Sequence, residues 1–272
     1  MSISAKDVMT LRQKTGLGMM ECKKALEETS GDLAAAEEHL RTQLKGKMDK
    51  RTERPAAEGR LAIKVAGDHS AAAMIEINTE TDFTARNESV AAVADTIAGL
   101  ALEQGSGGQV EKTDAITRHV DDIRISTSEN ASFRRGWKFT GGYCGGYLHH
   151  NAQVGVILQT TGPVDEETMT GICQHIAFAD PAGVDAGDIP QSEIDKVKAE
   201  AKQQAMDEGK PEEIAEKMVD GKVRKHLAEI TLLNQKYVKD TTGKAAVRDI
   251  LPAGVTVTAF KRFVVGLGGD EA

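Results

Sequence analysis

Alternation of apolar and polar side chains predicts a β-hairpin early in the main part of the chain. Apolar residues alternate over 61–65 and again over 71–77, and Gly67 with Asp68 suits the turn between them. From residue 88 the apolar spacing changes to three and four residues, which predicts one helix over 88–103 and another over 113–126. These elements form a first α+β unit.

The same order of elements returns later in the chain. Aromatic residues and a glycine-rich stretch precede an apolar strand over 154–158, and a helix carrying Met169, Ile172 and Ile176 follows. A helix is expected over 242–251 and a last strand over 255–265, with an irregularity near Ala259 and Phe260, where the alternation shifts. The repeated order of hairpin, polar turn and helix indicates two similar α+β subdomains with antiparallel sheets.

Three short helices are expected before the first hairpin. Ser4 suits a helix N-cap, Gly16 a helix end, and Gly31 the turn before a third helix. The stretch that follows, 45–59, is charged, contains Pro55 and has no apolar periodicity, so it is interpreted as a linker. Its basic residues offer an alternative role as an RNA contact.

A pair of charged helices with a narrow apolar stripe is expected after the second unit. Pro190 suits a helix start, and Gly209 and Pro211 break the pattern, which predicts a protruding antiparallel helical hairpin. The fold class is therefore α+β. The predicted divisions are a three-helix bundle (1–45), a linker (46–59), core subdomain N (60–130), core subdomain C (131–187 and 230–265), the hairpin inserted in it (188–229) and a tail (266–272).

Composition describes an ordinary globular chain. Of 272 residues, 40% are hydrophobic and 28% charged, and the net charge of −8 does not favour direct nucleic-acid binding. No apolar run approaches the roughly 20 residues that cross a bilayer, and the N-terminus lacks the apolar core of a signal peptide. The three cysteines are widely spaced, which fits a reducing compartment. We expect a cytoplasmic protein without a membrane partner.

No motif for bond chemistry is recognisable, so neither catalytic residues nor a cofactor are expected. Phosphate-binding loops, nucleophile elbows and HExxH zinc motifs are missing from the sequence. His149 and His150 lie near Cys144, but adjacent histidines on a strand point to opposite sides, so no metal site is expected. His175, at the end of an apolar helix, is interpreted as a packed or capping side chain.

The polar stretch 79–87 between the second strand and the helix contains an isolated aromatic residue, Phe83. In one interpretation, Phe83 folds back as a hydrophobic staple while Thr81 or Asp82 caps the helix. In the other, Phe83 projects as a wedge for a partner. Strand-to-helix turns often display functional groups, so both interpretations stay open at this point.

Four segments of the chain resemble signatures of the elongation factor Ts family. Residues 11–41 resemble its opening signature, and residues 81–88, TDFTARNE, resemble its second, which usually has Val at the position of Thr84. Residues 175–181 and 209–225 also match in order. The chain therefore resembles the bacterial translation factors of this family.

That resemblance implies a partner, the GTPase elongation factor Tu, in its GDP-bound and nucleotide-free forms. It implies a ubiquitin-associated-like N-terminal bundle that docks on the nucleotide-binding domain of the partner. It further implies that Phe83 wedges between helices of the partner and that Asp82 helps to displace Mg²⁺. The matching contact positions are Thr81, Asp82, Phe83 and Thr84 in the second signature, Arg12, Met19 and Met20 in the bundle, and His149.

The function implied is guanine-nucleotide exchange, in which binding of the chain promotes GDP release so that GTP can rebind. Such a factor makes and breaks no bond. The alternative is an adaptor that binds partners through the bundle without driving exchange. Thr84 and the altered turn containing Gln153 depart from the family pattern, and the chain ends without the longer tail of some relatives.

Overall fold

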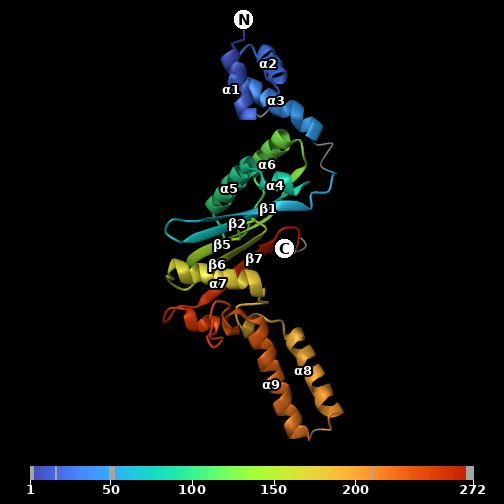
Figure 1. Ribbon diagram of the computed structural model, residues 1–272, viewed down its shortest axis with the longest axis vertical. Coiled ribbons are helices and arrows are strands. Elements are labelled where there is room, and N and C mark those ends of the chain that lie inside the picture. Colours follow the sequence, from blue (N-terminus) through green and yellow to red (C-terminus); the bar gives the residue numbers. More distant parts are fainter. Residues whose placement is uncertain (1–2, 16, 49–52, 210, 268–272) are drawn as a thin grey trace.

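The computed structural model describes residues 3–15, 17–48, 53–209 and 211–267. A helical bundle, a core of sheets and helices, and a pair of long helices follow one another along the longest axis of the molecule (Figure 1). Residues 49–52 of the predicted linker and residues 268–272 of the predicted tail lie outside the described residues. Gly16, the predicted end of the first helix, does so as well.

The N-terminal bundle consists of α1 (Ala5–Thr15), α2 (Met19–Glu28) and α3 (Leu33–Met48), which confirms the three predicted helices. Its small core is made by apolar side chains from all three helices: Val8, Leu11, Cys22, Ala25, Leu26, Ala36 and Leu40. Asp32 begins α3, because its carboxylate accepts hydrogen bonds from the backbone N–H groups of Ala34 and Ala35.

In the residues that the structure describes, seven strands form two antiparallel sheets. The first has the order β1-β2-β4-β3 and the second the order β5-β6-β7. The predicted first hairpin is confirmed, because β1 and β2 pair antiparallel along their whole length. The strands are β1 (Glu58–Val65), β2 (Ala71–Thr79), β3 (Gly108–Gln109), β4 (Ala131–Thr140), β5 (Tyr143–Leu148), β6 (Val154–Thr160) and β7 (Val257–Val264).

Strand β4 belongs to the first sheet, which differs from the predicted division at residue 131. It pairs with β2 from Ala71↔Thr140 to Thr79↔Ala131, and a register shift lies between Glu76 and Ile77. The sequence pattern placed these aromatic residues with the second unit because they adjoin the glycine-rich stretch. Which strands pair depends on how side chains pack across the sheet, including residues distant in sequence. Closeness along the chain was therefore a poor guide to the partner of β4.

The core has four layers (Figure 1). Helices α5 (Glu88–Glu103) and α6 (Asp114–Thr127) cover the outer face of the first sheet, and α7 (Glu166–Ala179) covers the outer face of the second. The two sheets pack against each other through a third buried cluster that includes Leu61, Met74 and Ile157. All three helices were expected, and both units contain a hairpin followed by a helix.

Strand β2 is buried on both faces, whereas the alternation of apolar residues in its sequence predicted one buried face. Ala73, Ile75 and Ile77 face α5 and α6, as the pattern predicts. Ala72 and Met74 on the opposite face are covered by the second sheet. Close approach of the layers depends on glycine, since a Cβ atom on Gly155 would lie 2.8 Å from Met74 Sδ.

Helices α8 (Gln191–Asp207) and α9 (Glu212–Ile230) project from the core as a pair (Figure 1). They run in opposite directions: His226 Nε2 lies 3.2 Å from Glu193 Oε1, and nearer the tip Lys222 bonds Gln204. Ala201 and Ala205 are buried between them. The small side chains allow the helices to approach closely, while charged residues cover their outer surfaces.

The segment before β7 is not the helix expected over 242–251. It holds only short turns of 3₁₀ helix, η3 (Leu232–Asn234) and η4 (Val247–Ile250), as η2 (Ala186–Asp188) does before α8. The carboxylate of Asp240 accepts bonds from the N–H groups of Lys244 and Ala245, which fixes a loop where a helix would begin. The expected irregularity in the last strand is present one residue early, at Thr258.

Candidate functional site

Phe83 projects from a short helix, α4 (Asp82–Arg86), which directly follows β2. Its side chain is 83% exposed, whereas Thr84 and Ala85 beside it are only 8% and 3% exposed. The Thr81 hydroxyl caps the helix by accepting a hydrogen bond from the N–H group of Thr84. Thr81 therefore caps, as one interpretation held, but Phe83 is displayed to solvent and not folded back as a staple.

The N-terminal end of α4 is tied to the turn that follows α6. Thr81 Oγ1 donates to Glu129 Oε1 at 2.9 Å, and the Thr81 N–H donates to Glu129 Oε2 at 3.2 Å. Next to this contact, Glu80 Oε1 accepts a hydrogen bond from the N–H of Asn130 at 2.6 Å. Two carboxylates thus join adjacent turns, and charge-assisted bonds of this kind are stronger than neutral ones.

The C-terminal end of α4 is held as well. Arg60 on β1 donates to the carbonyl oxygen of Ala85 at 2.8 Å. Burial lowers the pKa of the Arg60 guanidinium, an effect that Asp95 opposes. Asn87 ends α4 and caps α5, because its side chain accepts a hydrogen bond from the N–H of Ser89 at 2.9 Å. With both ends fixed, Phe83 has a defined position on the surface.

Asp82 lies beside Phe83 and forms an ion pair with Arg86 one turn later, at 3.1 Å. The Asp82 side chain is 37% exposed and that of Arg86 is 72% exposed. Exposed pairs at this spacing contribute little to stability, so the carboxylate can exchange its partner at small cost. The free chain thus presents a carboxylate and an aromatic ring side by side.

Thr84, the departure from the family pattern, faces the interior. Its side chain adds little to the exposed surface beside Phe83, because Thr84 is buried beneath α4. The side chains of adjacent residues on a helix point in directions about 100° apart, so Phe83 and Thr84 lie on different faces of α4. A hydroxyl at position 84 therefore concerns packing under the helix.

Among the side chains of the N-terminal bundle whose burial is described, three methionines are exposed. Met19 and Met20 begin α2 and are 53% and 76% exposed, and Arg12 is exposed on α1. Met9 on α1 is 57% exposed and was not among the predicted residues. Its position off the stripe formed by Val8 and Leu11 was the available signal. Flexible thioether side chains suit surfaces that bind proteins.

His149 lies in the turn after β5 and not on the strand, where adjacent histidines were expected to diverge. Its ring lies 4.3 Å from that of His150, and its Nδ1 is 2.8 Å from the Tyr147 hydroxyl. The strand ends at Leu148, so the alternation of side chains ends there as well. His149 also lines a groove of about 360 Å³ beside Phe178 of α7.

Phe178 is a second phenylalanine that the sequence did not single out. It lies in the last turn of α7 and is 79% exposed. It therefore belongs to the second sheet's side of the core, whereas Thr81, Asp82, Phe83 and Thr84 are brought together by α4 on the first. The apolar run around Phe178 predicted a helix but did not indicate that this residue would face solvent.

Thiol and metal chemistry find little support in the geometry. Burial raises the pKa of the Cys144 and Cys173 thiols, which disfavours the thiolate that binds metals or attacks substrates. Over the described ranges, no group of three or more His, Cys, Asp or Glu side chains could hold a metal ion. His175 is buried, as expected, and its Nε2 lies 2.9 Å from Gln235 Oε1.

None of the helices in the described part of the chain combines the length and apolar character needed to span a membrane. Three surface features stand out in the described residues: an aromatic ring with a carboxylate on α4, methionines on the bundle, and a groove beside His149. Each of these features is positioned by a separate packed unit.

Comparison with known proteins identifies the family of the chain. The family model described as Elongation factor TS matches residues 80–267. The chain is 39% identical over 282 residues to Elongation factor Ts of Halorhodospira halophila, covering 100% of this chain and 94% of the relative. It is 40% identical over 286 residues to that of Thioalkalivibrio sulfidiphilus, with the same coverage. It is 42% identical over 279 residues to that of Burkholderia ambifaria, covering 99% and 93%. The chain belongs to the elongation factor Ts family of translation factors.

Proposed function

We propose that this chain is a guanine-nucleotide exchange factor for elongation factor Tu. It binds the GDP form of that GTPase and promotes GDP release, after which GTP rebinds. Family membership supports the partner, and the observation that carries the proposal is Phe83, 83% exposed on a helix fixed at both ends. An aromatic ring held in a fixed position on the surface suits the role of an anchor that enters a pocket of a partner.

In this proposal, α4 enters the GTPase near its Mg²⁺ site. Phe83 inserts between helices of the partner, and burial of a phenylalanine contributes about 1.5–3 kcal/mol toward holding them apart. Asp82 exchanges its bond with Arg86 for a contact that weakens the support of the Mg²⁺ ion. Thr81 and Thr84 act from behind, as the cap and the packed base of the helix.

The bundle and the second sheet supply further contacts. Arg12, Met19 and Met20 dock the bundle on the nucleotide-binding domain, where the exposed thioethers bury apolar surface. His149 makes a contact from the opposite side of the core, oriented by its hydrogen bond with Tyr147. In this proposal, the contacts of the bundle and of His149 provide binding affinity. Helix α4 displaces helices and the Mg²⁺ support of the partner and so promotes GDP release.

Exchange then follows from thermodynamic linkage. GDP and Mg²⁺ stabilise each other in a GTPase, so removal of the support of the metal weakens nucleotide binding. A partner that binds the empty GTPase more tightly than the GDP form must weaken GDP binding by the same factor. No bond is made or broken, so the chain acts without catalytic residues or a cofactor of its own. The site of action is the cytoplasm, where translation takes place.

An adaptor that binds through the bundle without driving exchange is the alternative, favoured by the exposed Met19 and Met20. The test is release of fluorescent GDP from elongation factor Tu after mixing with the full chain and excess unlabelled GDP. Exchange predicts that the release rate rises with the concentration of the chain to a plateau far above the spontaneous rate. If the two proteins bind but GDP is released no faster than without the chain, the exchange proposal would be overturned and the adaptor favoured.

A further inference from the structure

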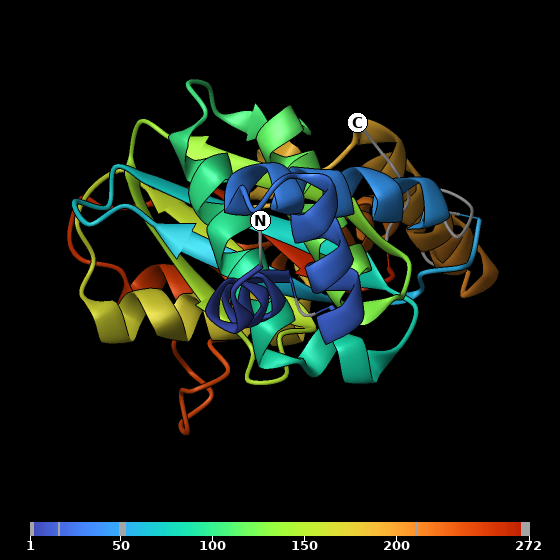
Figure 2. The ribbon, with the colours of Figure 1, turned by 90° about the horizontal axis from the view of Figure 1, so that it is seen from above.

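The N-terminal bundle contacts the core through a surface that is only partly packed. Helices α1 and α3 lie over α6, and the views in Figures 1 and 2 agree on this arrangement. The buried cluster of the bundle and that of the first sheet consist of separate residues. Between them lies a cavity of about 430 Å³, lined in part by Leu17 and Leu40 of the bundle and Val90 and Ile123 of the core.

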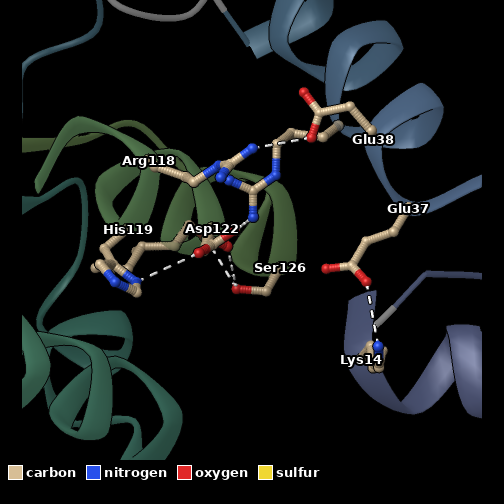
Figure 3. A network of polar contacts seen from close by, with 9 residues as sticks. Lys14, Glu37, Glu38, Arg118, His119, Asp122 and Ser126 are labelled. Atoms are coloured by element: carbon tan, nitrogen blue, oxygen red, sulfur yellow. Dashed lines mark hydrogen bonds and ion pairs between the residues drawn. The ribbon is translucent and has the colours of Figure 1, made fainter. Parts of the chain in front are cut away.

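Charged side chains bridge this loosely packed surface (Figure 3). Arg41 of α3 bonds the carboxylate of Asp122 on α6, and these side chains are 19% and 34% exposed. Arg118 of α6 pairs with Glu38 of α3 at 3.1 Å, with both side chains about 60% exposed. The first pair is thus partly shielded from water beside the cavity, and the second is open to water.

The contribution of each ion pair to docking depends on its exposure to solvent. The exposed Arg118–Glu38 pair is screened by solvent and contributes little. The shielded pair is different, because removal of one partner leaves the other charge uncompensated in a poorly solvated place. Burial raises the pKa of the Asp122 carboxyl, while Arg41, then His119 and Arg118, oppose that rise. Desolvation thus outweighs the attraction at Asp122, and Arg41 is the largest of the effects that favour its ionised form.

The docked position also carries a cost of its own. The Nη1 atom of Arg41 is buried and finds no hydrogen-bond partner in the described part of the chain. A buried donor without a partner and a cavity beside it both disfavour docking. These two features make the docked position less stable than a fully packed interface would be.

We propose that Arg41 and Asp122 form a latch that holds the N-terminal bundle in one docked position on α6 in the free chain. The latch sets the separation between the exposed methionines of the bundle and Phe83, because the bundle otherwise meets the core through few apolar contacts. Pre-setting two contact surfaces lowers the ordering cost of binding a partner that engages both. That use of the latch rests on the proposed function, whereas the latch itself does not.

The test measures the distance between bundle and core in the full chain by double electron–electron resonance. Spin labels are attached at Lys24→Cys on α2 and Thr96→Cys on α5, both exposed positions, while the three native cysteines are buried. The latch predicts one narrow distance distribution for the otherwise unchanged chain. Arg41→Met should lower the docking equilibrium by about 10- to 100-fold and produce a broad distribution at longer distance.

Matched variants separate the latch from general effects. Arg118→Met, which removes the exposed pair, should leave the narrow distribution in place. Asp122→Leu combined with Arg41→Met removes both charges and should restore it. Asp122→Arg, which opposes two guanidinium groups, is a second route to undocking, and circular dichroism verifies that each variant keeps its helices.

A narrow distribution that persists in both Arg41→Met and Asp122→Arg would overturn the latch, as would a broad distribution in the unchanged chain. The experiment uses no partner protein. Failure of the chain to accelerate GDP release would therefore contradict the proposed exchange function and leave the distance measurement as it stands. The two proposals can fail separately.

Discussion

Thr81 Oγ1 donates a hydrogen bond to Glu129 Oε1 at 2.9 Å, which joins the helix that carries Phe83 to the turn after α6. The two residues are 48 positions apart in the chain. Through this contact the position of the exposed ring depends on the packing of α6 against the first sheet, and not only on the short helix itself. A five-residue helix is too short to be stable alone.

The first prediction concerns this contact. Glu129→Ala should lower the free energy of unfolding by about 1.5–3 kcal/mol, because two hydrogen bonds from Thr81 to a charged acceptor are lost. Amide hydrogen exchange should accelerate at Thr84 and Ala85, whose helix is no longer fixed. Glu129→Gln, which keeps one acceptor oxygen, serves as the control with a smaller effect. Unchanged protection of α4 in Glu129→Ala would contradict this role.

The second prediction concerns the carboxylate beside Phe83. Asp82→Asn should slow the maximal rate of GDP release, because the neutral side chain loses its effect on the Mg²⁺ site. Arg86→Ala should not slow it, since that change only releases Asp82 from an exposed ion pair. Stopped-flow measurement at saturating concentration compares the two variants. Equal slowing in both would indicate that the ion pair matters and not the carboxylate.

Thr84→Val restores the residue usual in the family. Because Thr84 is 8% exposed and lies under α4, the change should raise the free energy of unfolding by less than about 1 kcal/mol. The rate of GDP release should stay within about twofold, as thermal denaturation and the release assay can establish. A large gain in release rate would mean that position 84 meets the partner directly.

A buried histidine makes stability depend on pH. Burial lowers the pKa of His175, while its bond with Gln235 opposes the shift, and the Val238 N–H donates to its Nδ1. Below about pH 6.5 the unfolded chain takes up a proton at this residue, whereas the folded chain takes it up only at lower pH. The free energy of unfolding should therefore fall as pH decreases below 6.5, by at most about 1.4 kcal/mol per pH unit from this group.

The measurement is denaturant unfolding between pH 5 and pH 8. His175→Gln should flatten the dependence on pH in this range, at some cost in stability at neutral pH. His150→Gln, a change at an exposed histidine, should leave the dependence as it is. A slope that His175→Gln does not alter would assign the pH dependence to other groups.

The elements that position Phe83 were predictable because they are local. Strand β2, the cap at Thr81 and helix α5 follow from alternation, a capping residue and helical spacing within about 30 residues. The exposure of Phe83 was open between two interpretations, because whether an aromatic ring finds cover depends on residues distant in the chain. Glu129 and Arg60, which fix α4 from behind, carry no local signal.

The errors have the same physical origin. Strand β4 joined the first sheet although its neighbours in sequence suggested the second. The helix expected over 242–251 gave way to a loop fixed by Asp240, whose pKa falls to about 2 because backbone N–H groups and Thr242 donate to its carboxylate. A side chain that competes for backbone donors overrides apolar spacing. Apart from the boundary at residue 131, the extents of the predicted domains remain predictions, as do the roles of the site residues.

The central claim is that Phe83 acts as a wedge that drives nucleotide release. The most direct measurement is the maximal rate of GDP release from elongation factor Tu at saturating concentrations of Phe83→Ala. Loss of about 1.5–3 kcal/mol of burial predicts a rate at least about tenfold below that of the unchanged chain. Phe178→Ala, a change at the other strongly exposed phenylalanine, should keep the maximal rate even if half-saturation shifts. A maximal rate that Phe83→Ala leaves unchanged would contradict the wedge.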